Sequence, residues 1–264
     1  MNQKFVFLDI DGTIIDTNEV IHNSTAEAIK LAQKNGHKLF LCTGREKHIV
    51  TPKLFELGLS NGVFSAGASI ICDDKEIYHS SFSPEVYDKM INVLVDHNAL
   101  IVLEGFNEEI LLNDTYKENY THFKEWLKQL GSVFIDGISH GLNNIDKVVF
   151  FASDCSVEQL SKEMGNECNI VTMSYQSGDN GGEIMQTGIT KATGIEKILE
   201  YYGVDIKDTI GIGDGANDIE MLKFCNTGIA MGNSDKRAKD AADIITDDIT
   251  DDGLYNAFKR MELI

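Results

Sequence analysis

An apolar stretch near the start of the sequence ends at two aspartates. It reads FLDIDGT, in which one isoleucine separates Asp9 from Asp11 before the chain turns at Gly12. An isolated Asp-Gly pair is common in surface turns, so this motif alone predicts no chemistry. Paired carboxylates at the end of a buried strand can nevertheless bind a hard cation, attack an electrophile or transfer a proton.

A second acidic motif, GIGDGANDIEM, occurs late in the chain. Asp214 ends another apolar stretch, and Asp218 lies four residues further on, in the first turn of an expected helix. An acid at the start of a helix is ordinary, which explains Asp218 alone. Asp214 would repel Asp9 and Asp11 unless a cation lay between them. The two motifs together predict that two or three carboxylates converge on Mg²⁺.

The glycines of the second motif allow another interpretation. Gly211, Gly213 and Ala216 match the G-x-G-x-x-A pattern of dinucleotide-binding sites, between an expected strand and an expected helix. Asp214 would then face the pyrophosphate and repel it, and only about one further strand-helix unit follows. The G-x-x-x-x-G-K-[ST] sequence of P-loop nucleotide hydrolases is absent from the sequence. The motif therefore favours a metal site.

Other polar residues also follow apolar stretches or open helices. Thr43, Gly44 and Arg45 follow KLFLC, and Lys191 opens an expected helix after GIT. Taken singly, Thr43 is typical of a helix cap and Lys191 of a surface lysine. A hydroxyl beside a helix N-terminus, together with a lysine, can bind a phosphoryl group. Their significance depends on whether the fold brings them to the aspartates.

The alternation of strand and helix patterns indicates how these residues meet. Residues 4–9 and 38–42 are expected strands, separated by a helix that Ser24 caps, and the next helix is interrupted at Pro52. The alternation resumes at Lys191, and this pattern predicts a parallel sheet. The carboxyl ends of parallel strands line one ligand crevice, which would bring both aspartate motifs and the TGR sequence together.

The middle of the chain has a different pattern. From Ser83 onward, a helix leads into neighbouring strands that have no helix between them, and further helices are expected near 118–130 and 156–164. Neighbouring strands of this kind predict antiparallel pairing in a separately packed α+β unit. We therefore expect an α/β fold. It would consist of a Rossmann-like parallel-sheet core, residues 1–81 and 186–264, and an inserted α+β cap domain, residues 82–185.

Charge and composition exclude several classes of function. The 264 residues include 23 basic and 42 acidic side chains, a net charge of −19, and no dense Lys/Arg run, so no nucleic-acid partner is expected. Five cysteines without a CxxC pair are typical of reduced core thiols. The sequence has neither a signal-peptide pattern nor an apolar stretch of membrane length. We expect a cytoplasmic monomer or homodimer that binds a small ligand.

Four motifs in this order, DIDGT, TGR, a lysine and GDGANDIEM, resemble the haloacid dehalogenase superfamily of phosphoryl-transfer enzymes. In particular, they resemble its Cof-type branch, which has a large α/β cap. The resemblance covers the whole chain and extends to MGNSDKRAKDAAD and ITDDGLYNAF, which are similar to the family's closing segment. The D-x-D-G-T and G-D-x-x-N-D elements are its specific signals. One departure is Ala66-Gly67, where many relatives have Asn-Gly after the third strand.

The resemblance implies a role for each candidate residue. Asp9 would be the nucleophile that forms an aspartyl phosphate. Asp11 would protonate the leaving alcohol and later activate water. Mg²⁺ would be bound by Asp9, the backbone carbonyl of Asp11 and Asp214, with Asp218 orienting its ligands. The residues implied to contact the substrate or its phosphate are Gly12, Thr43, Gly44, Arg45, Lys191 and Asn217.

The activity implied by the resemblance is that of a Mg²⁺-dependent phosphatase acting on small phosphorylated metabolites, with sugar phosphates as the expected class. The inserted domain would be a lid that selects the substrate, with hinge segments near Phe82 and at 185–188. The polar loop at 176–182 would either face the substrate or be a flexible surface loop. Two alternatives stay open: a phosphomutase using the same aspartyl phosphate, and a catalytically silent ligand-binding module. Free phosphate accumulates only for the hydrolase. Paired carboxylates facing an anion argue against a mere binder.

Overall fold

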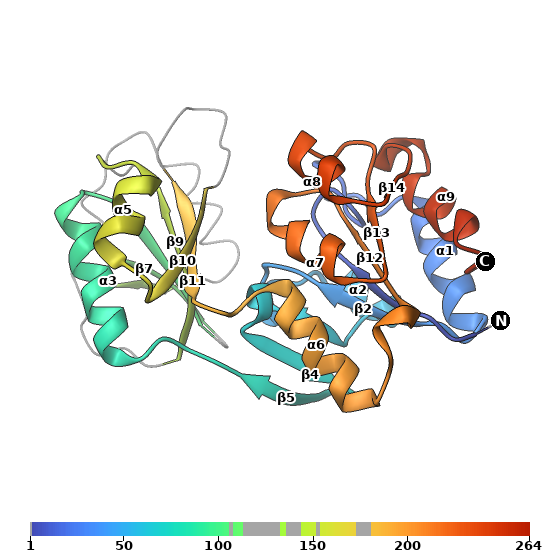
Figure 1. Ribbon diagram of the computed structural model, residues 1–264, viewed down its shortest axis with the longest axis horizontal. Helices are drawn as coiled ribbons and strands as arrows, with labels where there is room; N and C mark the ends of the chain where they lie inside the picture. The colour runs from blue at the N-terminus through green and yellow to red at the C-terminus, as the bar shows by residue number, and fades with distance from the viewer. Residues whose placement is uncertain (1, 106–107, 113–132, 136–143, 152–153, 173–180) are drawn as a thin grey trace. The chain divides into compact units, whose positions relative to one another are not determined.

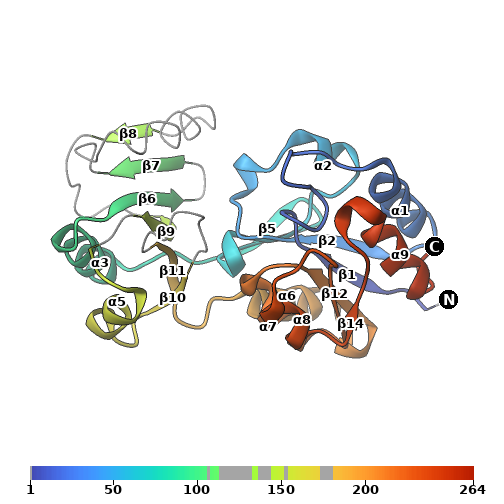
Figure 2. The ribbon, with the colours of Figure 1, turned by 90° about the horizontal axis from the view of Figure 1, so that it is seen from above.

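The computed structural model describes residues 2–105, 108–112, 133–135, 144–151, 154–172 and 181–264. The chain divides into two compact units, and the second interrupts the first (Figures 1 and 2). The first unit comprises Met1–Arg45, Val50–His79 and Thr190–Ile264, and the second comprises Glu46–Ile49 and Ser80–Ile189. The sequence places the junctions at 81/82 and 185/186, and the assignment of the inserted residues as a cap stays a prediction.

The first unit is built on a mostly parallel sheet. Its eight strands, within the part of the chain that is described, have the order β14-β13-β12-β1-β2-β3-β4-β5. All neighbouring pairs from β14 to β3 are parallel, whereas β3, β4 and β5 pair antiparallel. The strands are β1 Phe5–Leu8, β2 Lys38–Cys42, β3 Gly62–Phe64, β4 Ser69–Cys72, β5 Lys75–His79, β12 Thr209–Gly213, β13 Thr227–Ala230 and β14 Ile244–Ile245. This sheet confirms the predicted α/β fold class.

Helices cover both faces of this sheet, as Figures 1 and 2 show. Val6 and Leu8 of β1 lie in the hydrophobic core shared with α1 (Asn23–Lys34) and α9 (Gly253–Arg260). Phe5 and Phe7 face the opposite way and pack in the core shared with α6 (Lys191–Tyr202) and α7 (Ile219–Phe224). Burial of each such side chain contributes about 1.5–3 kcal/mol. A strand that is apolar at every position therefore marks the centre of a sheet that is covered on both sides.

Local details of the first unit agree with most sequence expectations, with one correction. Pro52 begins α2 (Pro52–Glu56), and the turn between β4 and β5 falls at Asp73 and Asp74, both with positive φ. Helix α1 instead begins at Asn23, with His22 at the N-cap. The prediction that Ser24 caps this helix was wrong because the extended backbone of His22 places Ser24 inside the first turn. The remaining helix of this unit is α8 (Lys236–Ala241).

The second unit contains a separate sheet with the strand order β10-β11-β9-β6-β7-β8. Its pairs are antiparallel except for β7 with β8. The strands are β6 Leu100–Gly105, β7 Glu108–Leu112, β8 Val133–Ile135, β9 Ile145–Phe151, β10 Cys168–Thr172 and β11 Gly182–Gln186. Helices α3 (Pro84–Asp96) and α5 (Val157–Met164) pack on one face (Figure 1). The helix expected at 118–130, and most of the loop expected at 176–182, lie outside the described residues.

Candidate active site

Three adjacent parallel strands bring most of the sequence-predicted residues to one edge of the sheet. β1 lies between β2 and β12, and all three run in the same direction. Asp9 directly follows β1, Thr43 directly follows β2 and Asp214 directly follows β12. This edge is formed by the carboxyl ends of the strands, where α/β proteins bind their ligands.

A buried lysine connects the two aspartate motifs. The Nζ atom of Lys191 donates hydrogen bonds to Oδ1 of Asp9 at 2.6 Å and to Oδ1 of Asp218 at 2.5 Å. The side chain of Lys191 is 1% exposed, and those of Asp9 and Asp218 are 7% and 0% exposed. Burial removes the water that would surround the ammonium group, and two carboxylates take its place. The lysine is therefore part of the site and not a surface residue.

The start of α6 positions this lysine. Thr190 is the N-cap, and its side chain accepts a hydrogen bond from the backbone N–H of Thr193. Gly67 has a φ of +118°, and a Cβ atom on it would lie 2.3 Å from the carbonyl oxygen of Thr190. Ala66, which stands where many relatives have asparagine, donates its backbone N–H to the carbonyl of Thr43 at 3.0 Å. The Ala66-Gly67 turn therefore packs by its backbone against the segment that carries Lys191.

Asp218 is fully engaged by hydrogen-bond donors. Its Oδ1 atom accepts from Lys191, and its Oδ2 atom accepts from the backbone N–H groups of Asp214 and Gly215 at 2.9 Å each. A Cβ atom on Gly213 would lie 2.4 Å from Cγ of Asp218, so only glycine leaves space for this carboxylate. Asp218 thus fixes the loop after β12 and holds the lysine toward Asp9. Its geometry suits a residue that positions the lysine and this loop.

Asp214 lies directly against the glycine turn of the first motif. Its Oδ1 atom accepts a hydrogen bond from the hydroxyl of Thr13 at 3.3 Å. A Cβ atom on Gly12, which has a φ of +81°, would lie 2.2 Å from Oδ2 of Asp214. Asp9, Asp214 and Asp218 each offer an oxygen, and these atoms all lie within 4.8 Å of one another. A set of carboxylate oxygens at this spacing fits a hard divalent cation.

Burial and neighbouring charge raise the pKa values of Asp9 and Asp214. Burial raises the pKa of Asp9 well above its usual value, and the charge of Asp218 adds to the effect although Lys191 opposes it. Burial and Asp218 likewise raise the pKa of Asp214 to about 7. Burial alone would lower the pKa of Lys191, but Asp218 and Asp9 raise it well above its ordinary value. Three carboxylates and one ammonium leave an excess of negative charge, which a dication would offset.

Asp11 is turned away from this cluster toward Arg45. Its two oxygens accept hydrogen bonds from Nη2 of Arg45 at 2.5 Å and from Nε at 2.9 Å, and its side chain is 59% exposed. The backbone N–H of Arg45 donates to the hydroxyl of Thr43 at 3.0 Å, with half-buried Gly44 between them. Asn217 lies in the 3-10 turn after Asp214 and is half-buried.

Sequence reasoning missed two residues that support the turn after β1. Thr13 contacts Asp214, as described, and Asn233 donates its side-chain amide to the carbonyl of Gly12 at 2.8 Å. The Oδ1 atom of Asn233 accepts from the backbone N–H of Ile249 at 3.0 Å. The MGNSD sequence contains this asparagine, but its partner is 221 residues away and no local pattern reveals the contact.

The family model of haloacid dehalogenase-like hydrolases matches residues 6–258. The chain belongs to this family. Among similar proteins, Bacillus subtilis YkrA, which carries a provisional phosphatase assignment, is 28% identical over 100% of both chains. The 5-amino-6-(5-phospho-D-ribitylamino)uracil phosphatase YcsE of Bacillus subtilis is 26% identical over 98% of this chain and 96% of its own. Both of these relatives are named as phosphatases.

Solved structures of the superfamily have the same fold. A subclass IIB sugar phosphatase is 26% identical, with a TM-score of 0.84 over 99% of this chain and 100% of that chain. A second structure, from a study of a trigonal-bipyramidal intermediate in a phosphoryl-transfer superfamily, is 26% identical and has a TM-score of 0.84 over 100% of both chains. Among the residues that the structure describes, no helix is both long and apolar enough to cross a membrane.

Proposed function

We propose that this haloacid dehalogenase-like hydrolase is a Mg²⁺-dependent phosphatase of small phosphorylated metabolites that works through a phosphoryl group carried on Asp9. The observation that carries the proposal is the buried contact of Lys191 with Asp9 at the carboxyl edge of the sheet. A carboxylate held by a buried ammonium keeps its position but remains a nucleophile, because Oδ2 is not the oxygen that the lysine contacts.

In the first step, Oδ2 of Asp9 attacks phosphorus, and the bond between phosphorus and the alcohol oxygen breaks. Asp11 donates its proton to the departing oxygen, which requires Asp11 to leave Arg45 and rotate toward the substrate. Lys191 and the hydroxyl of Thr43 hold the phosphoryl oxygens and offset the charge that spreads over them in the transition state.

In the second step, water attacks the phosphorus of the aspartyl phosphate. Asp11, now ionised, accepts a proton from the water, and the bond between phosphorus and Asp9 breaks. Inorganic phosphate leaves, the carboxylate of Asp9 is restored and Asp11 is protonated again for the next cycle. One carboxyl group thus acts as the acid and then as the base.

Asp9, the backbone carbonyl of Asp11 and Asp214 would hold the Mg²⁺ ion. When bound, the ion neutralises the charge between the carboxylates and the incoming phosphate ester, which the net charge of −19 otherwise repels. Asp218 would keep Lys191 and the loop after β12 in place without binding the ion directly, since donors occupy both of its oxygens.

Sugar phosphates are the substrate class that we propose. The support comes from the similar subclass IIB sugar phosphatase and from a relative that is named for a phosphorylated ribityl compound. We propose that the inserted unit selects among such esters as a cap. We also propose a cytoplasmic location, supported by five cysteines that form no disulfide, which suit a reducing compartment.

A panel of phosphate esters, assayed with Mg²⁺ and with excess EDTA, tests this proposal. We expect sugar phosphates to give the highest kcat/KM, free phosphate to accumulate in equal amount to the alcohol, and turnover to stop in EDTA. Full turnover by metal-free protein would contradict the metal assignment. Formation of an isomeric phosphate ester in place of free phosphate would identify a phosphomutase.

A further inference from the structure

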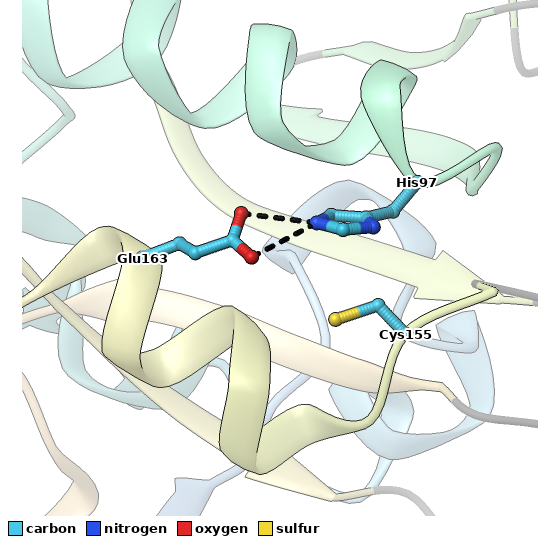
Figure 3. Close-up of side chains that lie close together, drawn as sticks. All are labelled: His97, Cys155 and Glu163. Atoms are coloured by element: carbon cyan, nitrogen blue, oxygen red, sulfur yellow. Dashed lines mark hydrogen bonds and ion pairs between the residues drawn. The ribbon is translucent and has the colours of Figure 1, made fainter.

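Three side chains of different metal-binding types converge in the second unit. His97 follows the C-terminal end of α3, Cys155 precedes α5, and Glu163 lies in the last turn of α5. A ring nitrogen, the sulfur and a carboxylate oxygen from these residues all lie within 4.8 Å of one another. Figure 3 shows Glu163 facing the ring of His97, with the sulfur of Cys155 pointing toward the same region.

The contacts within this cluster already resemble a partly formed coordination shell. The Nε2 atom of His97 lies 3.1 Å from Oε1 and 3.0 Å from Oε2 of Glu163. Ligand atoms around one tetrahedral Zn²⁺ ion lie roughly 3.3–3.6 Å apart, given bonds of about 2.0–2.3 Å. Rotation of the three side chains toward a common centre would therefore admit an ion between the imidazole, the carboxylate and the sulfur.

Neighbouring groups hold Glu163 and Cys155 in place. The side-chain amide of Gln159 donates to Oε1 of Glu163 at 3.1 Å and fixes the carboxylate. Ser156, the N-cap of α5, accepts from the backbone N–H of Gln159, so the positive end of this helix lies next to Cys155. Burial raises the pKa of Cys155, and a backbone hydrogen bond from Leu160 opposes this effect. Such supporting contacts are typical of built metal sites.

Access and ligand chemistry together select the class of ion. Cys155 is 3% exposed, but the side chain of Glu163 is 38% exposed, so an ion can enter from the Glu163 side. One thiolate, one imidazole and one carboxylate suit a borderline-soft ion such as Zn²⁺, whereas Mg²⁺ prefers oxygen ligands only. We propose that His97, Cys155 and Glu163 form a Zn²⁺ site separate from the proposed Mg²⁺ site, with water as the fourth ligand.

This site would join the end of α3 to α5. On binding, the thiol of Cys155 loses its proton to solvent and the sulfur forms a bond to the ion. A three-ligand bridge between two helices on the same face of the sheet should stabilise the second unit against unfolding. The exposed pair of His97 and Glu163 alone would contribute only about 0.2–1 kcal/mol.

Cobalt substitution tests the proposal directly. The full-length protein is saturated with Mg²⁺ and titrated with Co²⁺, because bound Co²⁺ shows a near-ultraviolet charge-transfer band only when a thiolate is a ligand. We expect a band that saturates at one Co²⁺ per chain and disappears on adding Zn²⁺. Cys155→Ser should abolish it, and Glu163→Gln or His97→Gln should weaken Co²⁺ binding at least about ten-fold.

Matched controls come from the same unit. Cys168→Ser changes a second, half-buried cysteine, and Glu167→Gln changes a carboxylate that pairs with Lys89. Both should leave the band unchanged. The proposal is overturned if wild-type protein shows no thiolate band, or if the band survives Cys155→Ser or is lost in Cys168→Ser. If circular dichroism shows that Cys155→Ser does not fold, the Glu163→Gln variant, at an exposed position, tests the proposal instead. Unchanged Co²⁺ affinity in Glu163→Gln would equally overturn the proposal.

Discussion

Arg45 holds both carboxylate oxygens of Asp11, with Nη2 at 2.5 Å from Oδ1 and Nε at 2.9 Å from Oδ2. The side chain of Asp11 is 59% exposed, and that of Arg45 is 23% exposed. A bidentate arginine contact fixes the plane of a carboxylate as well as its position. The structure therefore shows Asp11, the proposed general acid, in an orientation fixed by Arg45. Its side chain has to rotate to reach a phosphate ester.

Arg45→Gln should show whether the ion pair of Arg45 with Asp11 contributes to turnover, to the stability of the fold, or to both. Exposed ion pairs contribute about 0–1 kcal/mol, so we expect a loss of unfolding free energy below about 1 kcal/mol. We expect kcat/KM to fall at least about ten-fold, because the guanidinium of Arg45 would bind the anionic substrate once Asp11 turns away, and glutamine carries no charge to do so. Lys4→Gln is the control, since Lys4 pairs with Asp208 at 2.9 Å outside the site. Equal turnover in the two variants would show that Arg45 has no catalytic role.

Lys191→Met should be far more damaging to stability. It leaves Asp9 and Asp218 buried without their shared cation, a change that typically costs about 3–5 kcal/mol. Urea unfolding without added metal measures the loss, and Lys162→Met is the control because its pair with Glu158 is exposed and should contribute little. A loss below about 1 kcal/mol for Lys191→Met would mean that the ion pairs do not hold this site together.

Gly12→Ala should disrupt the site through Asp214. An alanine there combines a strained φ of +81° with a Cβ atom 2.2 Å from the Asp214 carboxylate. Gly36→Ala is the matched control, because Gly36 has a φ of +89° but no atom within 4 Å of the added Cβ. Both variants should lose about 1–2 kcal/mol of stability through backbone strain, but only Gly12→Ala should lose metal affinity and most turnover. Normal metal affinity in Gly12→Ala would argue against Asp214 as a ligand.

Much of this arrangement was predictable from local sequence, and some of it was not. Strands ending at Asp9 and Asp214 are visible as apolar runs, because a sheet covered on both faces is apolar at every position. The buried contact of Lys191 with Asp9 and the contact of Asn233 with Gly12 were not visible, since they join residues 182 and 221 positions apart. The prediction that Ser24 caps α1 was wrong because serine is compatible both with the N-cap position and with the first helical turn.

A buried charge cluster in the second unit predicts a pH dependence of stability. Lys147 contacts Glu104 at 2.9 Å and Glu183 at 3.2 Å, so one ammonium serves two carboxylates. Burial and the charge of Glu183 raise the pKa of Glu104 from 4.5 to about 8, although Lys147 opposes the shift. The folded protein therefore keeps a proton that the unfolded chain loses, and stability should fall as the pH rises from about 4.5 to about 8.

Glu104→Gln should make the free energy of unfolding fall less steeply as the pH rises, because glutamine cannot ionise. Urea unfolding across the same pH range compares it with wild type, where one such proton contributes at most about 1.4 kcal/mol per pH unit. Glu158→Gln, at an exposed carboxylate, should keep the wild-type slope. Stability that falls equally steeply in Glu104→Gln would place the responsible proton elsewhere.

The aspartyl phosphate is the central claim, and trapping it tests the claim most directly. Asp11→Asn should still react with an aryl phosphate, whose leaving group needs no proton, but should be slow to hydrolyse the intermediate. Quenching the reaction and reducing the acyl phosphate with borohydride converts the phosphorylated aspartate to homoserine, which peptide mass spectrometry locates. We predict substrate-dependent homoserine at position 9, and none in an Asp9→Asn, Asp11→Asn double variant. Homoserine at another aspartate, or wild-type turnover by Asp9→Asn, would contradict the account.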